Sequence, residues 1–344
     1  MKRRKNNHIV TCITLIYMVT YSAYIGYRLF LQDRIELNKR QASIFIPSNA
    51  GIEELADTLI SAGIIKNSDR FRTHAAIHGF RTVMGGHYIV KKNMTYRNLV
   101  RMLISGQQTP VNLVISGTVR TKERLAKIIS RQIEADSVEV TDLLNDSVFL
   151  NELGFTPDNS ILLFIPNTYN VYWNRNIRQL FRDMKKEFDR FWSPERLAKL
   201  NSLNLTKIEA MIVASISSEE SNKYDELPCI AGVYINRLRI GMPLQADPTV
   251  KFAIGDFSLR RILTVHTEFD SPYNTYRHRG LPPGPICIPS PVAIDAVLDC
   301  ERHNYLYFCA KDDFSGYHVF AKTLQQHNQN ASLYGKALNR RKIY

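Results

Sequence analysis

The clearest hydrophobic pattern in the chain lies in residues 206–220, where apolar side chains recur at every fourth position. The positions on this face are Ile208, Ile212 and Ile216. Thr206, with a glutamate three residues later, forms a capping box that marks the start of a helix. Glu220 is the next position on the same face. The pattern therefore predicts a helix over 206–220 whose apolar stripe ends in a carboxyl group.

A second pattern is an uncharged run from 9 to 27. It follows four basic residues, Lys2, Arg3, Arg4 and Lys5. About twenty apolar residues span a bilayer core as one helix, so we expect a transmembrane helix over 9–30. By the positive-inside rule, 1–8 stay in the cytoplasm and the rest of this single-pass chain lies outside. A cleaved signal peptide is the alternative, but the run is longer than a typical h-region and lacks a clear small-x-small site, which favours an uncleaved anchor.

Short strands and amphipathic helices alternate after this run. Residues 31–42 carry mixed charges and are predicted to be a juxtamembrane linker. Strands are expected at 44–46, 85–89 and 113–115, and helices with three- and four-residue apolar spacing at 52–60, 95–104 and 120–133. This order predicts a small α+β domain over 43–116.

The rest of the chain is predicted to be richer in helix. Residues 117–200 form a connecting helical region that includes an amphipathic helix at 180–192. The inward positions of that helix are Phe181, Met184, Phe188 and Phe191. Residues 201–336 form a mixed α+β domain, followed by a basic tail at 337–344. Paired strands are expected at 306–308 and 316–320. The fold class is therefore α+β, with one N-terminal transmembrane helix, a small domain and a larger mixed domain.

The formal net charge of +13 over 344 residues comes from basic residues spread along the chain. Spread positive charge suits a membrane surface or an acidic wall polymer as well as nucleic acid, and it also serves general solubility. The sequence has no dense basic stripe interleaved with aromatic residues. We therefore predict no nucleic-acid partner.

Cysteine and histidine spacing does not indicate a metal site. The five cysteines form no CxxC pair, and the nine histidines form no HExxH motif. An odd number of cysteines leaves at least one unpaired, and the four beyond Cys12 could form disulfides in an oxidising compartment. Since a free cysteine packs as a small hydrophobic residue, we favour buried free thiols. No metal and no cofactor is predicted.

Glu220 is the strongest candidate for chemistry. A carboxyl that ends an apolar stripe is partly desolvated where its helix meets the core, and desolvation favours the protonated form. A protonated carboxyl at neutral pH is what a general acid requires. The alternative is that Glu219 and Glu220 form an ordinary solvated pair near a helix end, since perturbed carboxyls are only candidates for function.

Polar and aromatic residues lie among turn formers in the segments after this helix. These segments read Ile-Asn-Arg-Leu (235–238), Gly-Met-Pro-Leu-Gln-Ala-Asp-Pro-Thr (241–249), Ser-Pro-Tyr-Asn-Thr-Tyr (271–276) and Gly-Leu-Pro-Pro-Gly-Pro-Ile (280–286). Loops held by a scaffold commonly carry binding groups. The order and composition of these segments closely resemble the endolytic murein transglycosylase, or YceG-like, family, which cuts peptidoglycan glycan strands. The resemblance runs from about residue 44 to 334 and is sharpest over 214–289.

The resemblance implies that Glu220 is the catalytic glutamate and that 43–116 form a LysM-like domain. In the family's Glu-x-Glu pattern, the upstream glutamate falls on Ser218, so this chain lacks one acidic position. Glu219 lies about 100° around the helix and does not replace it. Ser218 and Glu219 are therefore assigned to supporting positions. Asn167 is a second departure, since the family usually has Asp there.

A glycosidic bond breaks when its leaving oxygen is protonated while positive charge develops on the sugar. A hydrolase normally needs a second carboxylate. In a transglycosylase the sugar's own C6 hydroxyl attacks C1 and forms a 1,6-anhydro ring, an intramolecular step. We therefore expect Glu220 to act first as acid and then as base, on the bond between N-acetylmuramic acid and N-acetylglucosamine. The candidates for holding the sugars are Asn236, Gln245, Asp247, Tyr273, Asn274 and Tyr276.

Three functional classes follow. The leading one is a lytic transglycosylase, a carbon–oxygen lyase anchored in the inner cell membrane, with its catalytic domain on the periplasmic or other extracytoplasmic side. The second is a catalytically weak or inactive scaffold that binds peptidoglycan. The third is a lysozyme-type hydrolase that uses Asp247, although an Asp-Pro-Thr turn with a capping Asp explains this residue equally well. Peptidoglycan strands are the expected partner, with penicillin-binding protein synthases as a further candidate.

Overall fold

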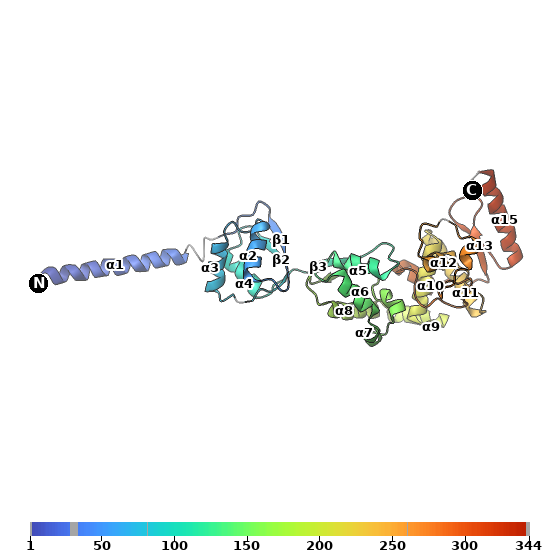
Figure 1. Cartoon of the computed structure of the whole chain (residues 1–344), viewed down its shortest axis with the longest axis horizontal. Helices are drawn as coiled ribbons and strands as arrows, with labels where there is room; N and C mark the ends of the chain where they lie inside the picture. Colours follow the sequence, from blue (N-terminus) through green and yellow to red (C-terminus); the bar gives the residue numbers. More distant parts are fainter. Residues whose placement is uncertain (1, 28–33, 81, 260, 342–344) are drawn as a thin grey trace. The chain divides into compact units, whose positions relative to one another are not determined.

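The computed structural model describes residues 2–27, 34–80, 82–259 and 261–341, and the chain divides into two compact units (Figure 1). The first unit contains the chain up to Leu113 together with 132–134 and 170–175. The second unit contains Val114–Arg131, Ala135–Tyr169 and the chain from Asn176 onward. The predicted regions 117–200 and 201–336 thus fall largely in one unit, and the division between them stays a prediction.

The first unit begins with α1 (Lys2–Tyr27), which contains the predicted apolar helix. Its stretch Val10–Tyr27 is long and apolar enough to cross a membrane, and none of it is buried against the rest of the protein. Residues 28–30, the end of the predicted span, lie outside the described residues, as do 31–33 of the predicted linker. The predicted helix is therefore confirmed over its described residues.

The remainder of this unit is a small α+β domain. β1 (Gln41–Ile46) pairs antiparallel with β2 (Gly86–Lys91). The helices are α2 (Ile52–Ser61), α3 (Ser68–Ile77) and α4 (Tyr96–Ile104). The largest fully buried side chains of its core are Tyr88, Phe71, Leu55, Leu59, Leu99 and Leu103. The predicted strands and the helices α2 and α4 are confirmed, and the likeness to LysM stays a prediction.

The sequence pattern did not predict α3, and its side chains explain why. This helix buries His74 together with Phe71, so its inward face is not purely apolar. Asn67 caps it, with its side-chain oxygen accepting from the amide of Asp69 at 2.7 Å. A polar residue at a buried position weakens the periodic signal on which the prediction depends.

The second unit is mostly helical. Its elements before the site are α5 (Lys122–Ser130), α6 (Ser137–Asn145), α7 (Ser147–Glu152), the 3-10 helix η2 (Pro157–Leu163), α8 (Ile177–Phe191) and α9 (Pro194–Leu203). They are followed by α10 (Lys207–Glu220), η3 (Tyr224–Glu226), α11 (Leu227–Arg239), α12 (Asp247–Ile254), α13 (Thr264–Thr267), α14 (Pro291–Leu298) and α15 (Leu324–Arg340). The amphipathic helix predicted at 180–192 is α8. It buries Phe181, Met184 and Phe188 as expected, whereas Phe191, the last residue of the helix and the fourth predicted core position, is only half-buried.

Two small sheets complete the architecture. β3 (Val111–Ile115) pairs with β4 (Asn167–Val171), and both strands are divided between the two units. β5 (Tyr307–Ala310) pairs antiparallel with β6 (His318–Ala321), which confirms the predicted C-terminal hairpin. The mixed α+β class is therefore confirmed.

Helix α10 is the centre of the second unit's core. Residues 210–217 are all buried, and the helix packs against α11, α12 and α14. Small side chains such as Ala210, Ala214 and Ser215 let neighbouring helices approach it from several sides. Ser215 bonds within its own helix, with Oγ donating to Ile212 O at 2.8 Å, so its burial leaves no unpaired hydroxyl.

Candidate active site

The last turn of α10 brings Glu220 from the core to the edge of a cavity. The predicted capping box is present at the other end, where the amide of Thr206 donates to Glu209 Oε2 at 2.7 Å. Since the middle of the helix is buried, Glu220 can be only partly exposed. A negative charge at a helix C-terminus is also unfavourable, which adds to the preference for a neutral carboxyl.

The carboxyl of Glu220 accepts a hydrogen bond from the hydroxyl of Tyr234 at 2.5 Å. Tyr234 lies on α11 and is 2% exposed. Burial raises its pKa well above the usual range, and the charge of Glu220 raises it further, so the hydroxyl keeps its proton and donates. Tyr234 is not among the site residues predicted from the sequence. The feature of the sequence that could identify it is a tyrosine on the apolar face of a predicted helix, because a buried hydroxyl needs a hydrogen-bond partner.

Burial raises the pKa of Glu220 to about 7, and the nearby charge of Asp247 contributes to this rise. The hydrogen bond from Tyr234 and the positive charges of Lys251 and Arg237 act in the opposite direction. The predicted desolvation of Glu220 is thus present. A carboxyl with this pKa is protonated in about half of the molecules at neutral pH and gains or loses its proton readily, which suits a group that must serve as both acid and base.

The cavity beside Glu220 has a volume of about 460 Å³ and is rich in polar and aromatic side chains. Its polar and aromatic lining includes Tyr234, Arg237, Gln245, Asp247, Tyr276, Tyr307, Phe308, His318 and His327. Such a mixture of hydrogen-bonding groups and rings is typical of a site for a polar ligand. Among the described residues, no group of three His, Cys, Asp or Glu is placed to hold a metal ion.

Asp247 and Tyr276 form a second carboxylate–tyrosine pair in the lining. The hydroxyl of Tyr276 donates to Asp247 Oδ1 at 2.6 Å. Asp247 begins α12, where a carboxylate is favoured by the helix dipole. The loops that carry the pair are joined behind it, since the Thr249 and Thr275 hydroxyls lie 2.8 Å apart and the main chain of Gln245 donates to Thr275 at 3.1 Å. The pair therefore has a fixed position.

Glu226 and His318 form a third pair, and the sequence analysis assigned neither of them to the site. Glu226 is 7% exposed and accepts from the main-chain amide of His318 at 2.7 Å. Its other oxygen lies 3.1 Å from His318 Nδ1 and also accepts from Ser221 Oγ at 3.2 Å. A carboxylate can only accept hydrogen bonds, so this contact assigns a proton to the Nδ1 atom of His318. The Nε2 atom of the same ring is then available to a ligand in the cavity. The signal in the sequence is weak, because the partners are 92 positions apart.

Arg237 holds the walls of the cavity together. Its Nε donates to Leu306 O at 2.6 Å, and its Nη1 donates to Leu244 O at 2.7 Å. The guanidinium also lies 5.2 Å from the ring centroid of Tyr307. A buried cation with these partners fixes the segment before α12 against the β5–β6 hairpin. Its principal role is therefore structural.

The structure brings some of the predicted sugar-binding residues to Glu220 and keeps others away. Gln245, Asp247 and Tyr276 line the cavity, whereas Asn236, Tyr273 and Asn274 do not. The amide of Asn236 donates to His303 O at 2.8 Å and Tyr305 O at 3.1 Å, and Asn236 borders a different cavity.

Asn274 and Tyr273 are placed to shape the loop that carries Tyr276. Asn274 is fully buried, and its amide donates to Thr267 O at 2.9 Å and Phe269 O at 2.7 Å. Its side-chain oxygen accepts from the amide of Tyr276 at 3.0 Å. The Tyr273 ring packs 4.8 Å from the ring of Phe252. Their contacts are with protein rather than with the cavity.

Ser218 and Glu219 do not line the cavity. Ser218 Oγ donates to Ser215 O at 3.1 Å and lies 3.7 Å from Cys287 Sγ. Glu219 pairs with Arg120 at 2.8 Å. The position at which the resemblance implies an upstream glutamate is therefore occupied here by a hydroxyl that bonds within its own helix.

Known proteins that are similar to this chain include YceG-like proteins and endolytic murein transglycosylases. The sequence profile of the YceG-like family matches residues 44–332. An endolytic murein transglycosylase of Streptococcus pneumoniae serotype 2 is 26% identical and aligns with 94% of this chain, which spans only 64% of that protein's length. An endolytic murein transglycosylase of Bacillus subtilis is 29% identical over 88% of this chain and 87% of its own.

A solved structure agrees with this grouping. The crystal structure of a YceG-like protein from Listeria monocytogenes has a TM-score of 0.55 and 26% identity with this chain. The match covers 85% of this chain and 99% of that one. The likeness therefore extends over both compact units rather than over the cavity alone.

Proposed function

This chain belongs to the YceG-like family, and we propose on that basis that it is a membrane-anchored endolytic transglycosylase of peptidoglycan. Its substrate is the glycan strand, and the bond it cleaves joins N-acetylmuramic acid to N-acetylglucosamine. The relatives from Streptococcus pneumoniae and Bacillus subtilis, both endolytic murein transglycosylases, support this substrate class. The observation that carries the proposal is the carboxyl of Glu220, with its raised pKa, at the edge of a polar cavity.

Glu220 performs the proton transfers in this proposal. As the bond between C1 and the leaving oxygen breaks, the neutral carboxyl gives its proton to that oxygen. The C6 hydroxyl oxygen of the same N-acetylmuramic acid then bonds to C1, and its proton passes to the carboxylate of Glu220. The products are a 1,6-anhydro end and a free 4-hydroxyl, and Glu220 is again protonated. No water is consumed, so no second carboxylate is needed to activate one.

The neighbours of Glu220 divide the remaining tasks. The hydrogen bond from Tyr234 holds the carboxyl in one orientation and stabilises it once it has lost its proton. The charge of Asp247 stabilises positive charge that develops on the sugar, and the hydroxyl of Tyr276 fixes its direction. Gln245 and His318 are placed to donate to or accept from sugar hydroxyl and acetamido groups. Asn236, Tyr273 and Asn274 support the loops, and Ser218 and Glu219 support α10.

The anchor in this proposal is α1. Its apolar stretch Val10–Tyr27 has the length of a membrane span. In this proposal the basic residues at 2–5 keep the N-terminus in the cytoplasm, so the chain that follows α1, including the whole second compact unit, lies on the extracytoplasmic side of the cell membrane. This location brings Glu220 to glycan strands close to the membrane, where penicillin-binding protein synthases are candidate partners.

A digest of purified peptidoglycan tests the cleavage reaction. We expect the full chain in detergent to release fragments with 1,6-anhydro ends, identified by mass spectrometry, and Glu220→Gln to release none. Glu219→Gln is the matched control, since it changes the adjacent carboxyl and should retain cleavage. Binding of glycan without cleavage by the wild type would favour the scaffold class.

The same digest separates the proposal from the hydrolase that uses Asp247. A hydrolase adds the oxygen of water to C1, whereas the intramolecular reaction does not. Fragments made in water labelled with oxygen-18 should therefore carry no label at the new muramic acid end. Labelled reducing ends that disappear in Asp247→Asn would contradict the transglycosylase proposal.

A further inference from the structure

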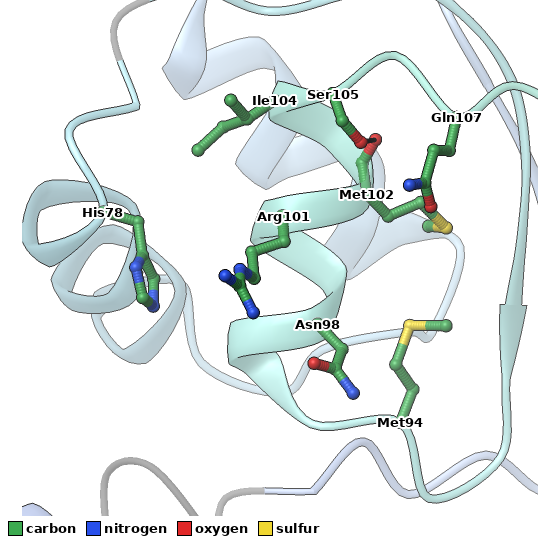
Figure 2. Close-up of a pocket in the computed structure, with 8 residues that line it drawn as sticks. All are labelled: His78, Met94, Asn98, Arg101, Met102, Ile104, Ser105 and Gln107. Atoms are coloured by element: carbon green, nitrogen blue, oxygen red, sulfur yellow. Dashed lines mark hydrogen bonds between the residues drawn. The ribbon is translucent and has the colours of Figure 1, made fainter.

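A second cavity, of about 580 Å³, lies in the first compact unit against α4 (Figure 2). Its lining includes Arg101 and Asn98 from α4, His78 from the end of α3, and Ser105 beyond α4. Figure 2 shows Arg101 extending from α4 toward the side on which His78 lies. No acidic residue occurs among the lining residues, all of which belong to the described part of the chain. The only permanent charge in the lining is therefore the positive charge of Arg101, and the neutral polar groups can both donate and accept hydrogen bonds.

Positive charge is concentrated around this cavity. Helix α4 carries Arg97 and Arg101 and contains no acidic residue. Burial lowers the pKa of His78, and the positive charges of Arg97, His74 and Arg101 lower it further. The potential at the imidazole is thus positive from several directions. An anion is the kind of ligand that such a field attracts.

Apolar side chains border the same cavity. Met94 and Met102 line it and are half-buried, and Ile104 lines it with 39% of its surface exposed. Ile77, the neighbour of His78 in the chain, is 47% exposed. Cationic donors next to exposed aliphatic groups are typical of surfaces that meet a membrane interface, where phosphate and ester groups lie together. A free inorganic anion would make no favourable contact with these aliphatic side chains, whereas the glycerol and ester groups of a lipid would.

The chain that follows α1 is bound to the rim of this cavity. Ile35 donates to Met94 O at 2.8 Å, and Asn93 donates to Ile35 O at 3.1 Å. Arg34 forms an antiparallel bridge with Thr95, the cap of α4. The segment from Tyr27 to Arg34 reaches at most about 25 Å even when fully extended. The rim of the cavity therefore lies within about 25 Å, along the chain, of the end of the apolar helix α1.

We propose that this cavity binds the phosphate of an anionic phospholipid headgroup. Arg101 supplies charge-assisted hydrogen bonds to the phosphate, and Asn98 and Ser105 supply neutral ones. Met94 and Ile104 contact the glycerol and ester region. Bound lipid holds the first unit against the membrane surface. The inference rests on the membrane anchoring proposed above and does not depend on the cleavage reaction.

Lipid titration of the full chain tests this site. Native mass spectrometry of the protein released from detergent micelles measures binding of dihexanoyl phosphatidylglycerol, dihexanoyl phosphatidylcholine and inorganic phosphate. We expect phosphatidylglycerol to bind at least about fivefold more tightly than phosphatidylcholine, because the cavity favours net negative charge. Arg101→Gln should weaken phosphatidylglycerol binding by about tenfold, and Asn98→Asp should weaken it at least as much, since it adds a negative charge. Inorganic phosphate should bind more weakly than the anionic lipid.

Arg40→Gln is the matched control, because Arg40 is an exposed arginine of the same unit outside the cavity lining. Equal losses in Arg40→Gln and Arg101→Gln would mean unspecific attraction and would overturn the site. Equal affinity for inorganic phosphate would make it a site for the free anion. Peptidoglycan digestion is measured with the same samples: normal cleavage without lipid binding rejects only this inference, whereas lipid binding without cleavage rejects only the proposed reaction.

Discussion

The hydroxyl of Tyr234 and the carboxyl of Glu220 lie 2.5 Å apart, on adjacent helices of one core. Tyr234 is almost fully buried, and Glu220 meets the cavity on one side. Phe308 packs edge-on against the ring of Tyr234, with centroids 5.9 Å apart, and this contact restricts the position of the tyrosine. The acid is thus oriented by a donor that the surrounding core holds in place.

Tyr234→Phe should change the pH dependence of cleavage. The hydrogen bond lowers the pKa of Glu220, so its removal should move that pKa above its present value of about 7. The alkaline limb of the pH–rate profile, where Glu220 loses its proton and the rate falls, should therefore shift to higher pH. We also expect kcat to fall by about tenfold, since a hydrogen bond to a charged carboxylate is lost.

Tyr169→Phe is the control for this change. Tyr169 is buried in the same unit, and its hydroxyl donates to Ile165 O, outside the cavity lining. Both variants should lose about 1 kcal/mol of stability from the missing hydrogen bond. An unchanged pH profile in Tyr234→Phe would show that the tyrosine does not tune the acid.

Glu220→Gln should stabilise the folded protein at alkaline pH while it abolishes cleavage. The pKa of Glu220 rises from its usual 4.5 to about 7 on folding, so the folded state holds this proton more tightly. The resulting stability is fully present below about pH 4.5 and is lost as the pH rises toward 7. Above that range the ionised carboxyl costs at most about 3 kcal/mol, which glutamine avoids.

Thermal unfolding from about pH 5 to 8 measures this effect. The melting temperature of Glu220→Gln should approach that of the wild type at the acid end and exceed it at the alkaline end. Glu219→Gln, which loses a partly exposed ion pair with Arg120, should show no such divergence. A constant difference between Glu220→Gln and wild type across the pH range would contradict the raised pKa.

His318→Asn and Glu226→Gln should raise the KM for the glycan substrate without shifting the pKa of Glu220. His318 lines the cavity, and Glu226 fixes its ring through Nδ1 at 3.1 Å. Loss of one hydrogen bond to the sugar predicts a KM about five- to tenfold higher, from steady-state cleavage of defined glycan strands. His266→Asn, outside the cavity lining, is the control. Wild-type KM in both variants would remove His318 from the site.

Gly284→Ala should destabilise the second unit. A Cβ at this position would lie 2.1 Å from the main-chain oxygen of Asp158 and 2.9 Å from the Tyr273 hydroxyl oxygen. Main chain must shift to accept it, which costs about 1–3 kcal/mol in a packed region. Gly335→Ala on α15 meets nothing within 4 Å and should be neutral or stabilising by up to about 1 kcal/mol. Equal melting temperatures for the two variants would contradict the close approach at Gly284.

Local features of the fold could be predicted because they depend on residues close together in sequence. The capping box at Thr206 and the fourth-residue apolar spacing define α10 within a few turns of chain. The same holds for the amphipathic α8, for the β5–β6 hairpin and for the apolar helix α1. By contrast, α3 was missed because the buried His74 interrupts its apolar face.

The sequence by itself determined that Glu220 ends the apolar face of a helix, which predicted a desolvated carboxyl but left a solvated pair of glutamates as the alternative. Only the tertiary structure decided which groups meet it: Tyr234 from α11, Asp247 with Tyr276 from two joined loops, and the pair of Glu226 and His318. It also turned Asn236 toward the main chain at 303–305 instead of the cavity. Periodicity encodes which face of an element is buried, but the long-range path of the chain decides which side chains converge, and that path depends on packing across the whole core.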